Sequence, residues 1–236
     1  MITVRKADER GRTKLAWLDS WHSFSFGDYR DRAHVSFGPL RVINEDVIAP
    51  GGGFAPHSHR DMEIVTYILS GALVHEDSLG NGSKILPGEV QRMSAGTGIT
   101  HSEFNASDSE PCHLLQIWLH PHREDRKPSY EQKRLPAEAA HGVLVPVAVP
   151  ETEAAKHPQA VAIGQDATIY AGKLAPGADT KLTFTPGRRC WIQLAKGKVE
   201  ANAIALDEGD GAAITGENLI SLKARTPSEV LVFDLP

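Results

Sequence analysis

IAPGGGFAPHSHRDMEIVTYILSG, residues 48–71, has a counterpart later in the chain, LAPGADTKLTFTPGRRCWIQLAKG, residues 174–197. The two segments align without a gap. Each begins with an apolar residue followed by Ala-Pro-Gly, and each ends with an apolar run closed by glycine. Internal similarity of this kind is typical of repeated structural units. The alignment therefore predicts that the chain contains two related units.

Two further pairs of segments are more weakly similar, and they follow in the same order in both halves of the chain. LPGEVQRMSAG resembles LDEGDGAAITG, and HLLQIWL resembles EVLVFDL. We expect the units to be joined near EDRKPSYEQKRLP, and we divide the chain into domains at residues 1–130 and 131–236.

Short apolar runs recur throughout the chain between Gly, Pro, Asn and Asp residues, which is the pattern of β-strands separated by turns. The clearest predicted strands are LRVINEDVI, EIVTYILSG, GALVHEDS, HLLQIWL, CWIQLAKG and EVLVFDLP. Asn81-Gly82 predicts a hairpin turn. Helical patterns are scarce, with one short helix expected within 136–141. The sequence therefore predicts an all-β protein built as sandwiches or barrels.

Composition restricts the function classes. The 236 residues are 41% hydrophobic and 23% charged, which is typical of a globular protein. The net charge of -5, without a run of Lys and Arg, argues against nucleic-acid binding. The charged N-terminal stretch lacks the apolar segment of a signal peptide, and no run is long enough to span a membrane. Cys112 and Cys190 are too few for a disulfide scaffold, so we expect buried, reduced thiols in a cytoplasmic protein.

His57 and His59 are separated by one residue in a predicted strand. Side chains alternate along a strand, so both imidazoles should project from the same face, as a metal site on a sheet requires. A His-x-His pair alone is weak support for metal binding. In the second half, the repeat places Thr183 and Thr185 at the two positions, and hydroxyl groups are poor ligands for transition metals. The second unit should therefore bind no metal.

A second cluster, MSAGTGITHSEFN, strengthens the metal hypothesis. His101 and Glu103 share one face of their strand, and the glycines Gly96 and Gly98 permit the tight turn before it. Two strands would then present three imidazoles and one carboxylate, a donor set suited to a divalent transition metal. We predict His57, His59, His101 and Glu103 as ligands.

The same residues resemble the motifs of the cupin superfamily. Gly51, His57, His59 and Gly71 are similar to the first cupin motif, and Gly98, His101 and Asn105 are similar to the second. The stretches SWHSFSFGDY, LRVINEDVI, HSHRDMEIVTYILSG and MSAGTGITHSE resemble the pirin family, most closely the bacterial pirin-like quercetin 2,3-dioxygenases. The resemblance covers essentially the whole chain. It implies a bicupin, with two antiparallel β-barrel or jelly-roll domains of which the second lacks metal ligands.

The resemblance also implies an activity: a metal-dependent dioxygenase that opens the heterocyclic ring of quercetin-like flavonols with O2 and releases CO. Many cupins take a fourth ligand from a glutamate five residues after the second histidine, where this chain has Ile64. Glu63 is one residue out of register and should face away. Glu103 then supplies the carboxylate and is our candidate catalytic base. Fe2+ is the first choice of metal, with Ni2+, Co2+, Mn2+ and Zn2+ as alternatives.

Two other functions stay open. Some pirins resemble iron-containing regulators that bind other proteins without turnover, and the chain could also be a cupin enzyme acting on another small molecule. A roomy pocket beside the ion would favour an enzyme, and a filled pocket would favour the regulator.

The family resemblance favours a monomer. We interpret His120 and His122 as loop residues and His75 as structural or solvated, whereas Phe24 and Phe26 form either a core stripe or a pocket wall.

Overall fold

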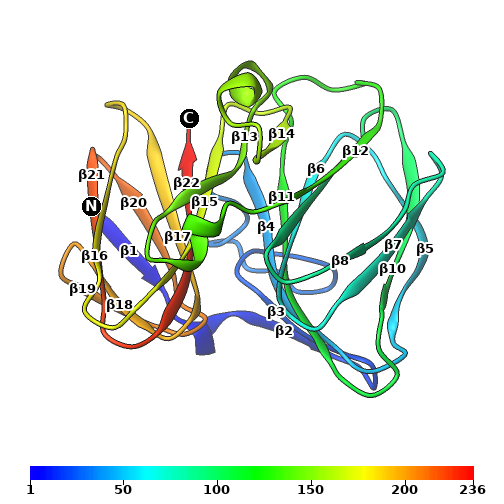
Figure 1. Cartoon of the computed structure of the whole chain (residues 1–236), viewed down its shortest axis with the longest axis horizontal. Coiled ribbons are helices and arrows are strands. Elements are labelled where there is room, and N and C mark those ends of the chain that lie inside the picture. The colour runs from blue at the N-terminus through cyan, green and yellow to red at the C-terminus, as the bar shows by residue number, and fades with distance from the viewer.

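The computed structural model describes residues 1–236, apart from the side chain of Ala140. The strands β1 to β22 form two barrel-like units that lie side by side, with the C-terminal unit on the left and the N-terminal unit on the right in Figure 1. The expected all-β architecture is confirmed.

The N-terminal unit consists of a large sheet that faces a small one. The large sheet has the order β12 (Ser129–Arg134), β9 (Glu89–Ser94), β6 (Glu63–Ser70), β11 (Cys112–Leu119), β4 (Leu40–Ile48), β3 (Leu18–His22) and β2 (Gly11–Lys14). The small sheet has the order β5 (Gly53–His59), β10 (Ile99–Asn105), β7 (Leu73–Asp77) and β8 (Gly82–Ile85).

The C-terminal unit is built in the same way. Its large sheet has the order β1 (Ile2–Arg5), β20 (Gly211–Thr215), β17 (Arg189–Lys196), β22 (Ser228–Leu235), β15 (Thr168–Leu174), β13 (Val145–Pro150) and β14 (Val161–Ile163). Its small sheet has the order β16 (Asp179–Thr183), β21 (Leu219–Ala224), β18 (Lys198–Ala201) and β19 (Ile204–Asp207).

The two strand orders correspond one to one. The order β9-β6-β11-β4 in the first large sheet matches β20-β17-β22-β15 in the second, and β5-β10-β7-β8 matches β16-β21-β18-β19. The segments 48–71 and 174–197, which align in the sequence, run through equivalent strands. The predicted internal repeat is therefore a structural repeat.

The two large sheets pack against each other between the units. Their contact is a shared apolar core that includes Val65, Leu115 and Ile117 from the first sheet and Ile169 and Phe233 from the second. Each large sheet also covers the interior of its own barrel, so its strands are buried on both faces. Strands in this position read as nearly continuous apolar runs rather than alternating ones, which explains why EIVTYILS and EVLVFDL were conspicuous in the sequence.

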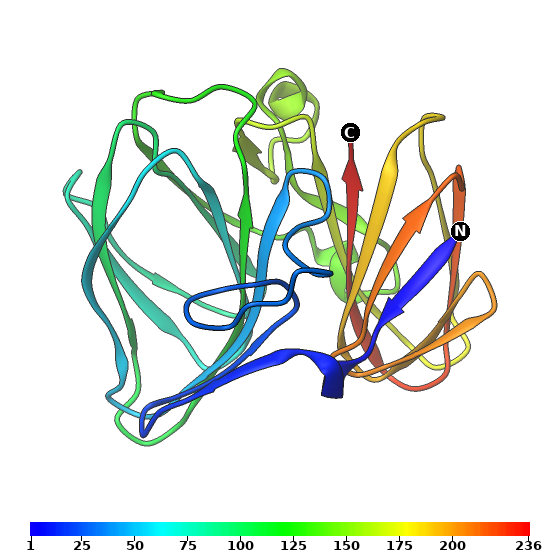
Figure 2. The ribbon, with the colours of Figure 1, turned by 180° about the vertical axis from the view of Figure 1, so that it is seen from behind.

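Two strands depart from the expected domain division. β1 lies at the start of the chain but pairs with β20 of the C-terminal unit, from Ile2 opposite Ile214 to Arg5 opposite Gly211. Figure 2 shows β1 beside the C-terminal strands and the chain after it crossing to the N-terminal unit. The boundary expected between residues 130 and 131 falls inside β12, all of which pairs with β9. Both pairings join segments that are far apart in the sequence, so a boundary drawn from the sequence alone cannot detect them.

Helices are short. The structure describes the 3-10 turns η1 (Ala7–Glu9), η2 (Ala137–Ala140) and η3 (Glu151–Lys156), and η2 is the short helix expected within 136–141. Among the helices of the described chain, none has the length and apolar character needed to cross a bilayer.

The interiors of the two barrels differ. Apolar side chains such as Phe184, Leu194 and Ile220 fill the C-terminal barrel. Thr183 and Thr185, which the repeat aligns with the two histidines, are exposed, because the inward positions there are Leu182 and Phe184.

The cause of this difference is a bulge in the N-terminal unit. β5 has one residue more than β10 between the pairs His57–His101 and Phe54–Glu103, whereas β16 pairs with β21 without interruption. One extra residue exchanges the inward and outward faces of a strand. The second barrel lacks the two histidines, and its inward positions carry apolar groups.

Candidate metal centre

β10 provides two of the four predicted donors. Its residues alternate between buried and more accessible, and the buried series is Ile99, His101, Glu103 and Asn105. Gly96 and Gly98 have positive φ angles of 48° and 139°, as the predicted turn before the strand requires. The alternation therefore directs the imidazole of His101 and the carboxylate of Glu103 into the N-terminal barrel.

β5 provides the other two predicted donors. His57 lies opposite His101 in the antiparallel pair of β5 and β10, and His59 lies opposite Ile99. The ring centroids of His57 and His101 are 4.5 Å apart, and those of His59 lie 4.8 Å from His57 and 4.9 Å from His101. Each ring offers a nitrogen within 4.8 Å of a nitrogen on the other two. Three imidazoles from two strands thus converge on one point.

Hydrogen bonds determine which nitrogen of each ring is free. His57 Nδ1 lies 2.8 Å from the carbonyl oxygen of Ala55, which can only accept, so Nδ1 carries the hydrogen and Nε2 keeps its lone pair. His75 donates from Nε2 to Asp77 (3.2 Å), which makes His75 Nδ1 an acceptor for His101 Nδ1–H (3.4 Å). His101 Nε2 is buried and has no partner among the described residues.

Burial also keeps the imidazoles of His59 and His101 neutral. It lowers the pKa of His101 to about 3, and the neighbouring His57, His59 and His75 lower it further. The pKa of His59 falls to about 4, through burial and the proximity of His57. A neutral imidazole with a free ring nitrogen is the form that binds a metal ion.

Glu103 is a buried carboxylate with one free oxygen. Its side chain is 3% exposed; Oε2 accepts a hydrogen bond of 2.9 Å from Gln116 Nε2, and Oε1 has no partner in the described structure. Burial raises the pKa of Glu103 to about 7, opposed by the Gln116 hydrogen bond and reinforced by the charge of Asp46. A buried anion without a counterion is costly, so the site is suited to a cation or a proton.

A cavity of about 190 Å³ adjoins these donors. His57, His59 and Glu103 line it together with apolar side chains that include Phe54, Ile64 and Trp118. The cavity gives a small molecule access to the histidines and to the carboxylate. Sites of this type, with few polar groups in an apolar wall, are typical of ligand-binding pockets.

The opposite wall of the cavity carries polar groups that sequence reasoning missed. Asp46 lines the cavity from β4, is 3% exposed, and has an Oδ1 atom with no partner within the described chain. Burial raises its pKa to about 6. His22 and Asn44 lie beside it, joined by a 2.8 Å hydrogen bond. In the sequence, Asp46 falls within the apolar run of a predicted core strand, where nothing local marks it as functional.

His75 is the second omission. It is fully buried on β7, and its ring stacks on Tyr130 with centroids 4.9 Å apart. His75, His101 and Glu103 form a second group of donors within 4.8 Å of one another. Both ring nitrogens of His75 have hydrogen-bond partners, namely Asp77 on Nε2 and Gln91 and His101 on Nδ1. His75 therefore contacts the Nδ1 side of the His101 ring and helps to orient it.

The remaining candidates lie outside the cluster. Glu63 accepts a hydrogen bond of 2.7 Å from Ser94, while its neighbour Ile64 faces the cavity, as the one-residue offset requires. His122 lies in the loop after β11 with its Nδ1 2.6 Å from the carbonyl oxygen of Gly164. Phe24 packs in the shared core, whereas Phe26 lines the cavity, so the two aromatic residues have different roles.

Comparison with known proteins agrees with this geometry. Residues 3–119 match the family model Pirin, and residues 153–235 match the model of the quercetinase C-terminal cupin domain. The chain is 45% identical over 237 residues to a quercetin 2,3-dioxygenase of Escherichia coli strain K12, which covers 100% of this chain and 99% of the relative.

Solved structures give the same result. The crystal structure of YhhW from Escherichia coli superposes with a TM-score of 0.93 at 44% identity, covering 100% of this chain and 98% of that one. The crystal structure of bacterial pirin YhhW in complex with nickel(II) gives a TM-score of 0.92 at 44% identity, covering 100% and 99%. The bicupin architecture implied by the family resemblance is thus confirmed, and the sequence and structure together show that the chain belongs to the pirin family.

Proposed function

We propose that this protein is a flavonol 2,3-dioxygenase that binds one divalent transition-metal ion through His57, His59, His101 and Glu103. Its substrate is a quercetin-like flavonol, whose heterocyclic ring is opened by O2 with release of CO. The relative with 45% identity carries the name quercetin 2,3-dioxygenase. The proposal extends that activity to this chain.

One observation carries the proposal. Three imidazoles converge on one point, and Glu103, a buried carboxylate with an unpartnered oxygen, belongs with His101 and His75 to an adjoining donor group beside the same cavity. A structural metal site would be closed by its ligands, whereas a catalytic site leaves coordination positions open. The cavity beside His57, His59 and Glu103 supports the catalytic alternative and argues against a regulator with a filled pocket.

The residues around the proposed metal site have different roles in the proposed reaction. When bound, the ion supplies Lewis acidity that lowers the pKa of the flavonol 3-hydroxyl group. Glu103 would act as a labile ligand whose Oε1 leaves the ion to accept the proton of that hydroxyl. Gln116 holds the other carboxylate oxygen in place. The apolar walls Phe54, Ile64 and Trp118 exclude water and hold the flat substrate against the histidines.

The donor set suits several metals. Imidazole and carboxylate bind Fe2+, Ni2+, Co2+, Mn2+ and Zn2+. We keep Fe2+ as the first choice, and the nickel(II) complex of the Escherichia coli pirin makes Ni2+ the first alternative. Metal analysis of freshly purified protein distinguishes them.

The decisive experiment is aerobic incubation of the metal-loaded protein with quercetin. We expect loss of the flavonol absorbance, with O2 consumed and CO released in equal amounts. Stable absorbance with all five metals would favour the regulatory alternative. Turnover of another aromatic compound without flavonol cleavage would favour a different cupin enzyme.

Matched histidine variants test the site. His57→Ala, His59→Ala and His101→Ala should each lower metal occupancy sharply, because each removes an imidazole from the converging set. His120→Ala and His122→Ala are controls, since they lie in the loop after β11 and should retain metal and activity. Equal metal content in all five variants would contradict the assignment.

We also propose that the protein is a cytoplasmic monomer with two domains. The cysteines Cys112 and Cys190 are free and buried, which supports a reducing compartment. Strand pairing supports a boundary after β12, with β1 added to the second domain.

A further inference from the structure

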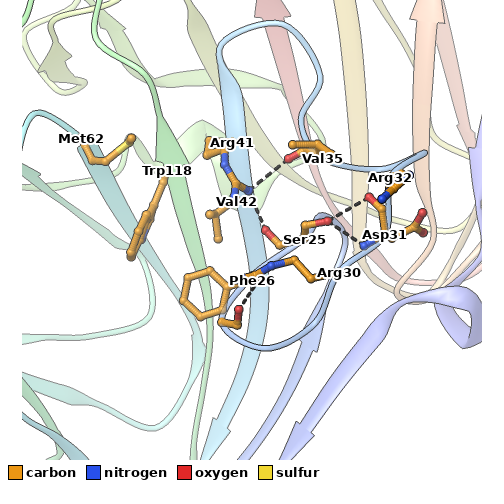
Figure 3. A pocket seen from close by; sticks show the side chains of 11 residues that line it. Ser25, Phe26, Arg30, Asp31, Arg32, Val35, Arg41, Val42, Met62 and Trp118 are labelled. Atoms are coloured by element: carbon orange, nitrogen blue, oxygen red, sulfur yellow. Dashed lines mark hydrogen bonds between the residues drawn. The ribbon is translucent and has the colours of Figure 1, made fainter.

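A second, larger pocket of about 830 Å³ adjoins the metal cavity. It lies between the segment of residues 25–35 and the strands β4 and β11, as Figure 3 shows. Its lining includes three arginines, Arg30, Arg32 and Arg41, beside the apolar side chains Met62 and Trp118. Three guanidinium groups around one pocket mark it as a site for negative charge.

Neighbouring carboxylates do not neutralise these arginines. No ion pair joins Arg30, Arg32 or Arg41 to a carboxylate in the described part of the chain. Asp31 lines the same pocket, but it is engaged by Arg5 (3.2 Å) and by His34 (2.8 Å). The pocket therefore keeps an excess of positive charge.

Arg41 is held in a fixed direction. It is half-buried on β4, and its Nη1 donates to the carbonyl oxygens of Ser25 (2.6 Å) and Val35 (3.1 Å). Figure 3 shows these two bonds along the wall of the pocket. Carbonyl oxygens orient the guanidinium without removing its charge. An oriented guanidinium binds an anion at a smaller entropic cost than a mobile one does.

Two aromatic side chains separate this pocket from the metal cavity. Phe26 and Trp118 line both, with ring centroids 5.4 Å apart and planes at 84°. Trp118 also meets His59 edge to face at 4.8 Å. The indole N–H of Trp118 is buried, and the described residues offer it no acceptor. We call Phe26 and Trp118 the doorway between the two pockets.

The volumes of the metal cavity and of the outer pocket indicate how a substrate would occupy both. The inner cavity measures about 190 Å³, below the roughly 300–1,000 Å³ of typical small-molecule sites. A polyphenol with several rings exceeds the inner cavity and extends through the doorway. The part that leaves the inner cavity then meets the arginines.

We propose that Arg30, Arg32 and Arg41 form an outer subsite that binds an anionic substituent of an aromatic substrate, while the ring to be oxidised occupies the inner cavity beside His57 and His59. This inference rests on the proposed function for the identity of the inner ring. The substrate class is an aromatic hydroxy compound that bears an acidic group, and Phe26 and Trp118 contact its middle.

Binding and turnover test the subsite separately. Quercetin and quercetin 5′-sulfonate are titrated anaerobically into the metal-loaded protein by calorimetry, and KM and kcat are then measured in air. Arg30→Gln, Arg32→Gln and Arg41→Gln should each weaken sulfonate binding about fivefold or more and weaken quercetin binding much less, because quercetin lacks the anionic substituent. Arg41→Lys keeps the charge and should recover part of the affinity. Added salt should weaken sulfonate binding more than quercetin binding.

Arg123→Gln is the matched control, because Arg123 is exposed and lies outside the lining of the pocket. Sulfonate binding unaffected by all three subsite variants would overturn the inference. Inorganic sulfate that binds as tightly as the sulfonated flavonol would also overturn it, since it would indicate a free-anion site. Loss of sulfonate binding in the variants of a protein that does not oxidise quercetin would support the subsite and contradict the proposed function alone.

Discussion

The Nδ1 atoms of His75 and His101 lie 3.4 Å apart inside the N-terminal barrel, and Asp77 lies 3.2 Å from the far side of the His75 ring. Asp77 fixes the hydrogen of His75 on Nε2, so His75 Nδ1 is an acceptor, which Gln91 Nε2 (3.2 Å) and His101 Nδ1–H share. This chain of contacts points the lone pair of His101 Nε2 toward the other two histidines. The relation makes His75 a positioning residue.

Replacement of His75 tests this role. His75→Phe keeps an aromatic ring against Tyr130 but removes the acceptor for His101. We expect metal affinity to fall about 10–100-fold, as is usual when a group that orients a ligand is lost. Competition with a chromophoric chelator measures the affinity, and the visible spectrum of the Co2+ form reports the geometry. His113→Phe is the control, because His113 bonds to Glu45 on the face of β11 that points away from the metal cavity. Unchanged affinity in His75→Phe would refute the role.

Glu103 combines metal binding with proton transfer in our proposal. Glu103→Gln retains an oxygen and the shape of the side chain but removes the base. We expect kcat to fall about 100-fold or more, since general base catalysis contributes roughly 10²–10⁴, while metal content falls much less. Parallel measurement of turnover and metal stoichiometry decides the matter. Equal losses of both would mean that Glu103 acts as a ligand and not as the base.

The raised pKa of Glu103 predicts a pH-dependent stability of the metal-free protein. The pKa is about 7 in the folded protein against 4.5 for the ordinary group, so between these values the folded state binds more protons than the unfolded state. Its stability therefore falls as the pH rises from 4.5 to 7.

The Glu103→Gln variant has no carboxyl group at this position, so its stability does not fall in this way as the pH rises. We therefore compare the Tm of the metal-free variant with that of the metal-free wild type. The Tm of the variant minus that of the wild type should be several °C larger at pH 8 than at pH 4.5, at about 2–4 °C per kcal/mol. Scanning calorimetry at the two pH values, with chelator present, measures the difference. A Tm difference independent of pH would contradict the perturbed carboxyl group.

Gly96 holds the turn that leads into β10. Its φ is 48°, and a Cβ atom there would lie 2.0 Å from the carbonyl oxygen of Arg126. Gly96→Ala should destabilise the protein by about 1–3 kcal/mol through strain alone, and the clash adds to this. Gly82→Ala is the control, because no atom lies within 4 Å of its added Cβ. Thermal unfolding of both variants checks the prediction, and similar Tm values would contradict it.

Local patterns predicted the strands well. LRVINEDVI coincides with β4, and EIVTYILS coincides with β6. These runs could be recognised because both faces of the large sheets are buried. Period-two spacing placed His101 and Glu103 on one buried face of β10, because the pleat of a strand needs no tertiary information.

Features that depend on distant pairing could not be predicted. His75 stands alone in its hairpin, and only the pairing of β7 with β10 brings it to His101. Thr183 is exposed because β16 lacks the bulge of β5, and that bulge has no sequence signature. The arginines of the outer pocket were missed for the same reason, since Arg41 comes from β4 and Arg30 from a loop.

The exchange of β1 also has a consequence for biosynthesis. Ile2 leaves the ribosome before its partner Ile214, which follows more than 200 residues later. At about 5–20 residues per second, the leading strand waits roughly 10–40 s without its neighbour. Until then, β1 has no strand to pair with, and the fold is completed only when β20 has been synthesised.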